Sequence, residues 1–190
     1  MDGDCRYAYI GFMEFIELVR KRKSVRNYLD TPVEPEKILR CLEAARLAPS
    51  ACNSQPWDFT VVTSPDKVKI LADCSREPVS GLNKWTSQAP AFAVVSAKRP
   101  NLTSSLGAFI KDRPFWLMDV GMAAEHFCLQ AAEEGLGTCM LGWFDEKKVR
   151  MLLDLPRSDR IVLLITLGYP RNPEVSAKTR KPLDSISRIV

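Results

Sequence analysis

The stretch that decides the fold runs from residue 48 to residue 57 and reads Ala-Pro-Ser-Ala-Cys-Asn-Ser-Gln-Pro-Trp. Its prolines, Pro49 and Pro56, disfavour a helix or a central strand, so the stretch is predicted to be a loop. The amide groups of Asn53 and Gln55 both donate and accept hydrogen bonds and can therefore bind the edge of a planar heterocycle. Taken alone, the stretch is better explained as a turn-rich connection before a strand.

Outward from this loop, segments rich in β-formers alternate with segments of helical period. Strands are expected over residues 57–63, 91–97, 138–143 and 161–167. Helices are expected over residues 12–23, from Pro35 onward, and over 64–74, 114–134 and 146–153. The helix from Pro35 is expected to turn one face inward, made of Ile38, Leu39, Leu42 and Ala45. This mixture predicts a sheet covered by helices, either α/β or α+β, and periodicity does not choose between them.

The helix expected over residues 114–134 is apolar around almost its whole circumference. Such a helix lies either in the centre of a core or at an oligomer interface. Its polar residues Asp119, His126 and Gln130 share one narrow stripe. His126 is the only histidine, which excludes a metal site built from several imidazoles. We expect it to form a hydrogen bond in the core or interface rather than to act in catalysis.

Composition narrows the class of protein. A chain of 190 residues with 46% hydrophobic and 26% charged residues is typical of one globular domain. Its net charge of +4 gives little support to nucleic-acid binding. Six cysteines without a C-x-x-C pair predict reduced thiols in a cytoplasmic protein. The acidic start over residues 1–4 does not fit a secretory signal, and charges interrupt the apolar runs, so no membrane span is expected.

Two basic clusters stand out, at residues 22–26 and 178–181. Each places cationic side chains beside a hydroxyl, which is what a phosphate group requires, because hydrogen bonds between charged partners are about twice as strong as neutral ones. The alternative is a solvated run of charges, and composition alone favours it. No G-x-G-x-x-G follows a strand and no Walker A sequence is present, so a Rossmann or P-loop nucleotide site is unsupported.

Taken together, these segments resemble the nitroreductase family of FMN-dependent oxidoreductases. Arg-Lys-Ser-Val-Arg at residues 22–26 resembles the family's opening R-[RHK]-S-x-[RK] motif, and residues 49–57 resemble its P-S-x-x-N-x-Q-P-W motif. The family's flavin-passing strand and its closing elements are matched by residues 135–142, 167–170 and 178–180. The ordered match spans about residues 12 to 184, so we expect a single FMN-binding domain over 12–190 after an extension over 1–11.

The resemblance implies an α+β fold with a mostly antiparallel sheet flanked by helices. It implies a homodimer with FMN at the subunit interface and a C-terminal tail that reaches the partner subunit. The phosphate and ribityl end of FMN would be held by Arg22, Lys23, Ser24, Lys178 and Arg180. The loop of the partner subunit would contribute Pro49, Ser50, Ala51, Asn53 and Gln55. Arg26 would approach the N1/O2 edge of the ring, the backbone near Leu141 and Gly142 would meet N5, and Asn83 falls at a weaker candidate contact.

The implied activity is reduction of bound FMN by NADH or NADPH, followed by transfer to a nitroaromatic, a quinone or a similar small electron-poor acceptor. Flavin carries this chemistry, so no catalytic side chain is expected. Two alternatives stay open, namely another flavin chemistry on the same scaffold, such as dehalogenation or dehydrogenation, and a non-catalytic flavin binder. Residues 98–113 are expected to be irregular and to shape the acceptor pocket.

Overall fold

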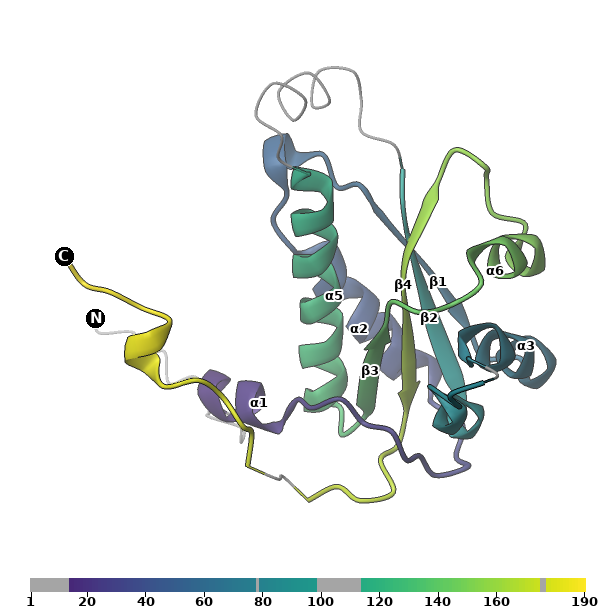
Figure 1. Cartoon of the computed structure of the whole chain (residues 1–190), viewed down its shortest axis with the longest axis horizontal. Coiled ribbons are helices and arrows are strands. Elements are labelled where there is room, and N and C mark those ends of the chain that lie inside the picture. Colours follow the sequence, from purple (N-terminus) through teal and green to yellow (C-terminus); the bar gives the residue numbers. More distant parts are fainter. Residues whose placement is uncertain (1–13, 78, 99–113, 175–176) are drawn as a thin grey trace, which may run out of the picture.

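The computed structural model describes residues 14–77, 79–98, 114–174 and 177–190. Over these ranges, four strands form one antiparallel sheet in the order β1-β2-β4-β3 (Figure 1). Their bounds are β1 Trp57–Val62, β2 Ala91–Ala97, β3 Gly137–Leu141 and β4 Arg160–Gly168. Sequence periodicity left α/β and α+β open, and the antiparallel pairing makes the fold α+β, as the family resemblance implied.

The helices follow the sequence signals closely. They are α1 Phe15–Lys21, α2 Pro35–Arg46, α3 Pro65–Ser75, α5 Phe115–Glu133 and α6 Glu146–Leu153, with short 3₁₀ helices η1 Ala51–Asn53, η2 Lys84–Gln88 and η3 Leu183–Ser185. Proline occupies the first turn of α2 and of α3, where its missing N–H costs no hydrogen bond. Asp145 caps α6 by accepting a hydrogen bond from the Lys148 N–H at 3.1 Å.

The sheet separates two layers of helices, with α2 and α5 on one face and α3 and α6 on the other (Figure 1). Strand β2 is buried along its whole length, so both of its faces pack in a core. Ala93 and Val95 point into the core with α2 and α5, while Phe92 and Val94 point into the core with α3 and α6. This central position explains why the strand reads as a continuous apolar run.

Helix α2 corrects one sequence expectation. Leu39, expected on its inward face, is 63% exposed, whereas Ile38, Cys41 and Ala45 are buried. Residues 38, 41 and 45 follow the i, i+3, i+7 spacing of one stripe, and Leu39 lies about 100° around the helix from Ile38. The small thiol of Cys41 therefore takes the inward place that we had assigned to the larger Leu39.

Helix α5 is both core and surface. Eight of its residues are buried, among them Asp119 and Phe127, but Phe115, Met118 and Met122 are exposed at i, i+3 and i+7. His126 faces α2, and its Nδ1 lies 3.2 Å from the Ala44 carbonyl oxygen, which confirms a hydrogen-bonding role for this residue. Across the described ranges, no helix has the length and apolar character needed to cross a membrane.

Two glycines permit close approaches, Gly137 to the basic segment and Gly168 to the chain before β2. A Cβ at Gly137 would lie 2.6 Å from Val25 Cγ2, and a Cβ at Gly168 would lie 2.5 Å from Pro90 Cδ. Any larger residue at position 137 would push the chain at Val25 away from β3. The expected loop character of residues 99–113 lies outside the described residues, as does the extension over 1–11.

Candidate functional site

The first basic segment runs along the edge of β3. Ser24 forms a parallel bridge with Thr138, and the Val25 N–H donates to the Thr138 carbonyl at 2.9 Å. Tyr28 then anchors the segment in the core, because its hydroxyl donates to the Val25 carbonyl at 2.9 Å and contacts the Thr166 hydroxyl at 2.7 Å. Burial raises the pKa of Tyr28 well above its usual value, so this phenol stays neutral. Ser24 and the exposed Arg26 are therefore held beside β3.

The two basic clusters converge. Arg22, at the C-terminal end of α1, is paired with Glu125 of α5 at 3.1 Å. Lys178 donates from Nζ to the Val19 carbonyl of α1 at 2.5 Å. Its pKa is lowered by partial burial and by the positive charges of Arg22 and Arg180. Like charges gathered in this way favour an anion with about two negative charges, such as a phosphate monoester.

The other predicted phosphate ligand, Lys23, turns toward the tail. Its Nζ donates to the Glu174 backbone carbonyl. A cavity of about 220 Å³ lies beside it, lined by Lys21, Arg22 and Lys23 together with the turn from Gly135 to Thr138. This side of the fold is therefore strongly cationic around the start of β3.

The loop at residues 49–56 has an unusual backbone. Cys52, Asn53 and Gln55 all adopt positive φ, at 53°, 53° and 44°. Non-glycine residues seldom do so, and positive φ in such a row requires local support. The Gln55 N–H donates to Ser50 Oγ at 3.0 Å, and the Gln55 amide contacts the Asn53 backbone and side-chain oxygens at 3.2 and 3.0 Å. These contacts turn the exposed amides of the predicted site residues outward as one group.

Asp119 is the support that sequence reasoning missed. It is 3% exposed, on α5, and its Oδ1 accepts a hydrogen bond from the Ala51 N–H at 3.1 Å. Its Oδ2 lies 3.4 Å from the Ser54 hydroxyl. The signal was present as an acidic residue in an otherwise apolar helix, but the polar stripe did not say which segment it would meet.

Within one chain, the loop and the basic cluster do not meet. The loop lies beside the N-terminal end of α5, whereas α1 lies toward its opposite end (Figure 1). No hydrogen bond or ion pair of the described residues joins residues 49–55 to Arg22, Ser24, Arg26 or Lys178. The two groups therefore form separate halves of any site that uses both.

The remaining predicted contacts are dispersed. Leu141 ends β3 and is buried, while Gly142 follows it and is exposed, with open space where a Cβ would be. Asn83 lies before η2 with φ 62°, and its amide donates to the Ser75 carbonyl at 3.0 Å. The structure thus gives Asn83 a role in joining η2 to α3, and a flavin contact there stays a prediction.

The thiols divide by burial. Cys41, Cys74, Cys128 and Cys139 are buried, and burial raises the pKa of Cys41 and of Cys128 to about 12. They pack as small apolar side chains, as the sequence indicated. Cys52 differs, because it is exposed at the centre of the loop.

Comparisons with known proteins agree with this geometry. A family model described as Nitroreductase family matches residues 19–169. The chain is 31% identical over 193 residues to the NADH dehydrogenase of Thermus thermophilus, which covers 87% of this chain and 91% of that protein. It is 28% identical over 170 residues to the iodotyrosine deiodinase of Thermotoga neapolitana, with coverage of 83% and 89%. An FMN-dependent nitroreductase from Clostridium difficile R20291 superposes with a TM-score of 0.73 at 29% identity, covering 92% and 98% of the two chains.

The chain therefore belongs to the nitroreductase family. It is an FMN-dependent oxidoreductase that uses a nicotinamide, NADH or NADPH, as its reductant. The residues present fit FMN in their chemistry. Arg22, Lys178 and Arg180 carry the positive charge that suits a phosphate, and the exposed amides of Asn53 and Gln55 suit the edge of a planar ring.

Proposed function

We propose that the chain forms a homodimer that uses NADH or NADPH to reduce nitroaromatics, quinones or similar electron-poor acceptors by a ping-pong mechanism. The observation that carries the proposal is the hydrogen bond from Lys178 to the Val19 carbonyl of α1, which brings the basic tail cluster to the helix that ends at Arg22. Arg22 and Arg180 lie close enough to Lys178 to lower its pKa, after the larger effect of its partial burial. The similarity to an iodotyrosine deiodinase supports a second candidate chemistry, reductive dehalogenation on the same fold.

The protein's own residues bind and orient. Arg22, Lys178 and Arg180 neutralise the phosphate, and Ser24 adds a hydroxyl donor next to β3. Arg26, exposed beside the same edge, supplies positive charge where reduced flavin develops negative charge, which favours the reduced form. FMN held by these residues would supply the chemistry, as the acceptor of a hydride from the nicotinamide and the donor of electrons to the second substrate. The backbone N–H groups at the end of β3, near Leu141 and Gly142, would orient the ring.

The loop would act on the site of the partner subunit. This assignment is supported by the separation of the loop from the basic cluster within one chain and by the exposed residues Phe115, Met118 and Met122 of α5. The C-terminal tail leads away from the body, with Leu183 and Ile186 exposed at 75% and 66% (Figure 1). Apolar side chains so exposed favour contact with a second chain.

The decisive experiment is the visible spectrum of the purified protein, before and after each nicotinamide is added in a stopped-flow instrument. We expect a yellow protein whose flavin absorbance is lost within the turnover time after a nicotinamide is added. The absorbance should return when a nitroaromatic or a quinone is added. A protein that stays colourless when mixed with FMN would refute the proposal. FMN that binds but is not reduced would identify a flavin binder instead.

Steady-state assays separate the two chemistries. Turnover of iodinated or brominated phenols, with none of nitro or quinone acceptors, would assign the chain to dehalogenation. Sedimentation tests the dimer independently, because a monomer that still holds FMN contradicts a site shared between subunits. We also propose that residues 12–190 act as one domain and that the protein works in the cytoplasm; limited proteolysis and cell fractionation would test these two points.

A further inference from the structure

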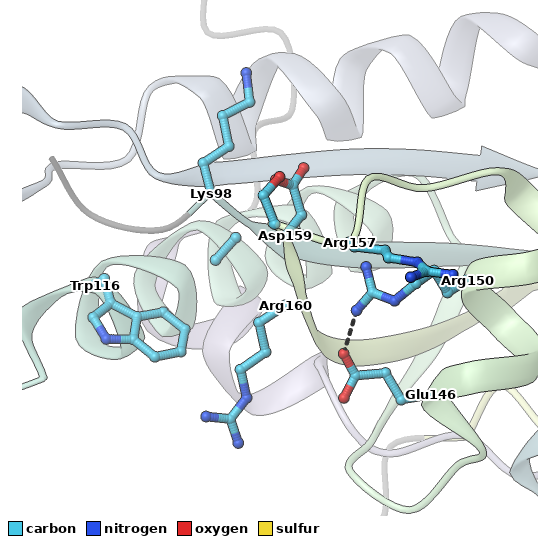
Figure 2. A pocket seen from close by; sticks show the side chains of 9 residues that line it. Lys98, Trp116, Glu146, Arg150, Arg157, Asp159 and Arg160 are labelled. Atoms are coloured by element: carbon cyan, nitrogen blue, oxygen red, sulfur yellow. Dashed lines mark hydrogen bonds and ion pairs between the residues drawn. The ribbon is translucent and has the colours of Figure 1, made fainter.

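A second cavity lies on a different part of the fold. It has a volume of about 430 Å³ and forms where β2 ends and β4 begins, between the start of α5 and helix α6 (Figure 2). None of its lining residues belongs to the basic segment at residues 22–26, the loop at 49–56 or the tail cluster at 178–181. The flavin site proposed above therefore does not account for this cavity.

Its charge is positive. Four cationic side chains line the cavity against two carboxylates, which gives a net charge of +2: Lys98, Arg150, Arg157 and Arg160 against Glu146 and Asp159. A concave surface with a net positive charge attracts anions, because the fields of neighbouring cations add in front of it.

Part of this charge is already used within the protein. Glu146 binds Arg150, with Oε1 2.6 Å from Nη2, and also accepts from the Ile161 N–H at 3.2 Å. Arg150 makes a further hydrogen bond to the Pro156 carbonyl. The pair therefore forms a fixed wall that joins α6 to the start of β4.

Two arginines remain available. Among the described residues, neither Arg157 nor Arg160 has an ion-pair partner, and Asp159 is hydrogen-bonded to the Ser158 hydroxyl at 2.9 Å. A guanidinium group offers several donors in a rigid plane that matches phosphate oxygens. A phosphate monoester carries about −1.5 to −2 charges at neutral pH, which balances the net charge of the cavity.

One wall is aromatic. The indole of Trp116 lines the cavity, and the Arg160 guanidinium carbon lies 5.8 Å from its ring centroid. In the view of Figure 2, Trp116 lies on one side and the Arg150–Glu146 pair on the other, with Arg160 between them. A flat ring can pack against the indole while its anionic group meets the arginines.

The volume selects for an organic ligand. Cavities that hold small molecules measure about 300–1,000 Å³, and 430 Å³ falls within that range. A single inorganic anion would leave most of the cavity, including the Trp116 wall, unused.

We propose that this cavity is a binding site for a small phosphorylated compound with a flat ring, of the size of a mononucleotide. Arg157 and Arg160 bind the phosphate and Trp116 packs on the ring. The site is separate from the flavin site, so its occupancy does not depend on whether the chain turns over nitroaromatics.

Isothermal titration of the full chain, saturated with FMN in phosphate-free buffer, tests the proposal with adenosine 5′-monophosphate as the probe. Inorganic phosphate and adenosine are titrated separately as the two half-ligands. We expect one site per subunit, with the nucleotide bound at least about tenfold more tightly than either half-ligand. The flavin spectrum, recorded in parallel, should show that FMN stays bound.

Variants locate the binding. Arg160→Lys keeps the charge but loses the planar group, and Arg157→Gln removes a charge from the surface, so both should fold. Each is expected to weaken nucleotide binding about tenfold. Trp116→Leu should weaken the nucleotide and leave phosphate unaffected. Arg76→Ala is the matched control, because Arg76 is an exposed arginine directly after α3, is paired with Asp73 and does not line the cavity.

Each other result overturns the proposal. Absence of nucleotide binding up to about 10 mM would mean that the cavity holds no such ligand. Phosphate that binds as tightly as the nucleotide would make it a site for inorganic anions only. Nucleotide binding that survives both arginine substitutions, or that displaces FMN, would place the ligand elsewhere. If the protein takes up no FMN, the same titrations on the flavin-free chain still decide the question.

Discussion

Asp119 should control how tightly the protein binds FMN, although it is expected to touch no flavin atom. Its carboxylate is buried on α5 and holds the loop through the Ala51 N–H and the Ser54 hydroxyl. Replacing it with alanine removes the acceptor and leaves the Ala51 N–H without its partner. The loop carries three consecutive or near-consecutive residues at positive φ, which is a costly backbone, so it should relax to other conformations.

The size of the effect follows from the geometry. The hydrogen bond at 3.1 Å joins a backbone N–H to a charged acceptor, and such bonds contribute about 1.5–3 kcal/mol. The contact at 3.4 Å to Ser54 is long and adds little. If the flavin-binding conformation of the loop is lost to that extent, the apparent FMN affinity falls by its remaining population, about tenfold to a hundredfold.

Flavin fluorescence titration measures the affinity, and thermal unfolding of the FMN-free protein measures the stability. Asp119→Ala should weaken FMN by that factor, whereas Asp119→Asn, which keeps an acceptor for the Ala51 N–H, should recover much of it. Gln130→Ala is the control, because Gln130 lies on the same stripe of α5 but binds Glu134 rather than the loop. Unchanged FMN affinity in Asp119→Ala, with only a lower unfolding temperature, would refute the reasoning.

Three further predictions concern the same site. Arg22→Ala should weaken FMN binding by about 1.5–3 kcal/mol, the value of a lost charged hydrogen bond. Glu125→Gln removes only the ion-pair partner of Arg22 and should leave FMN binding unchanged. Equal losses for the two variants in fluorescence titrations would mean that the ion pair, and not the cation, determines FMN affinity. Exposed Cys52 should react with a thiol reagent at pH 8 in a Cys5→Ser background. If the loop covers the flavin ring, bound FMN should slow this reaction. Equal reaction rates with and without FMN, measured by mass spectrometry, would exclude a loop that covers the ring. The pKa of Lys178 is lowered in the free protein, and a bound dianion would raise it. FMN affinity should therefore fall as pH rises through the lowered pKa, and Lys178→Arg should make this fall smaller. An FMN affinity that rises with pH would contradict the assignment of Lys178 to the phosphate.

The elements that the sequence predicted best are those with local causes. Strand β2 lies over residues 91–97 as expected, because a β-rich run ends at polar residues and both its faces are buried. Helices α2 and α3 begin at Pro35 and Pro65, since proline suits a first turn. Periodicity could not predict the antiparallel pairing, because the pattern within a strand says nothing about the direction of its neighbour, and only the family resemblance implied it.

The errors and omissions have non-local causes. Leu39 was expected inside and is exposed, because the inward stripe of α2 is set by where α5 packs against it, not by which apolar residues are available. Asp119 was seen as polar, but its partner is 68 residues away, and only the fold brings the two together. No sequence motif predicted the cavity beside Trp116, because its lining residues come from the end of β2, the start of β4 and two helices that are far apart in the sequence.

The cationic cluster indicates that FMN binding and the stability of the folded protein are coupled. Partial burial, and after it the positive charges of Arg22 and Arg180, lower the pKa of Lys178, so part of the shift reflects repulsion between these charges in the free chain. Lys178 is nevertheless held by the Val19 carbonyl, so the tail is attached to α1 close to the other cations. An anion with two charges removes that repulsion and, because it binds only the folded arrangement, stabilises it in proportion to the logarithm of its concentration. The order of the tail and the retention of the cofactor are therefore coupled through one electrostatic cause.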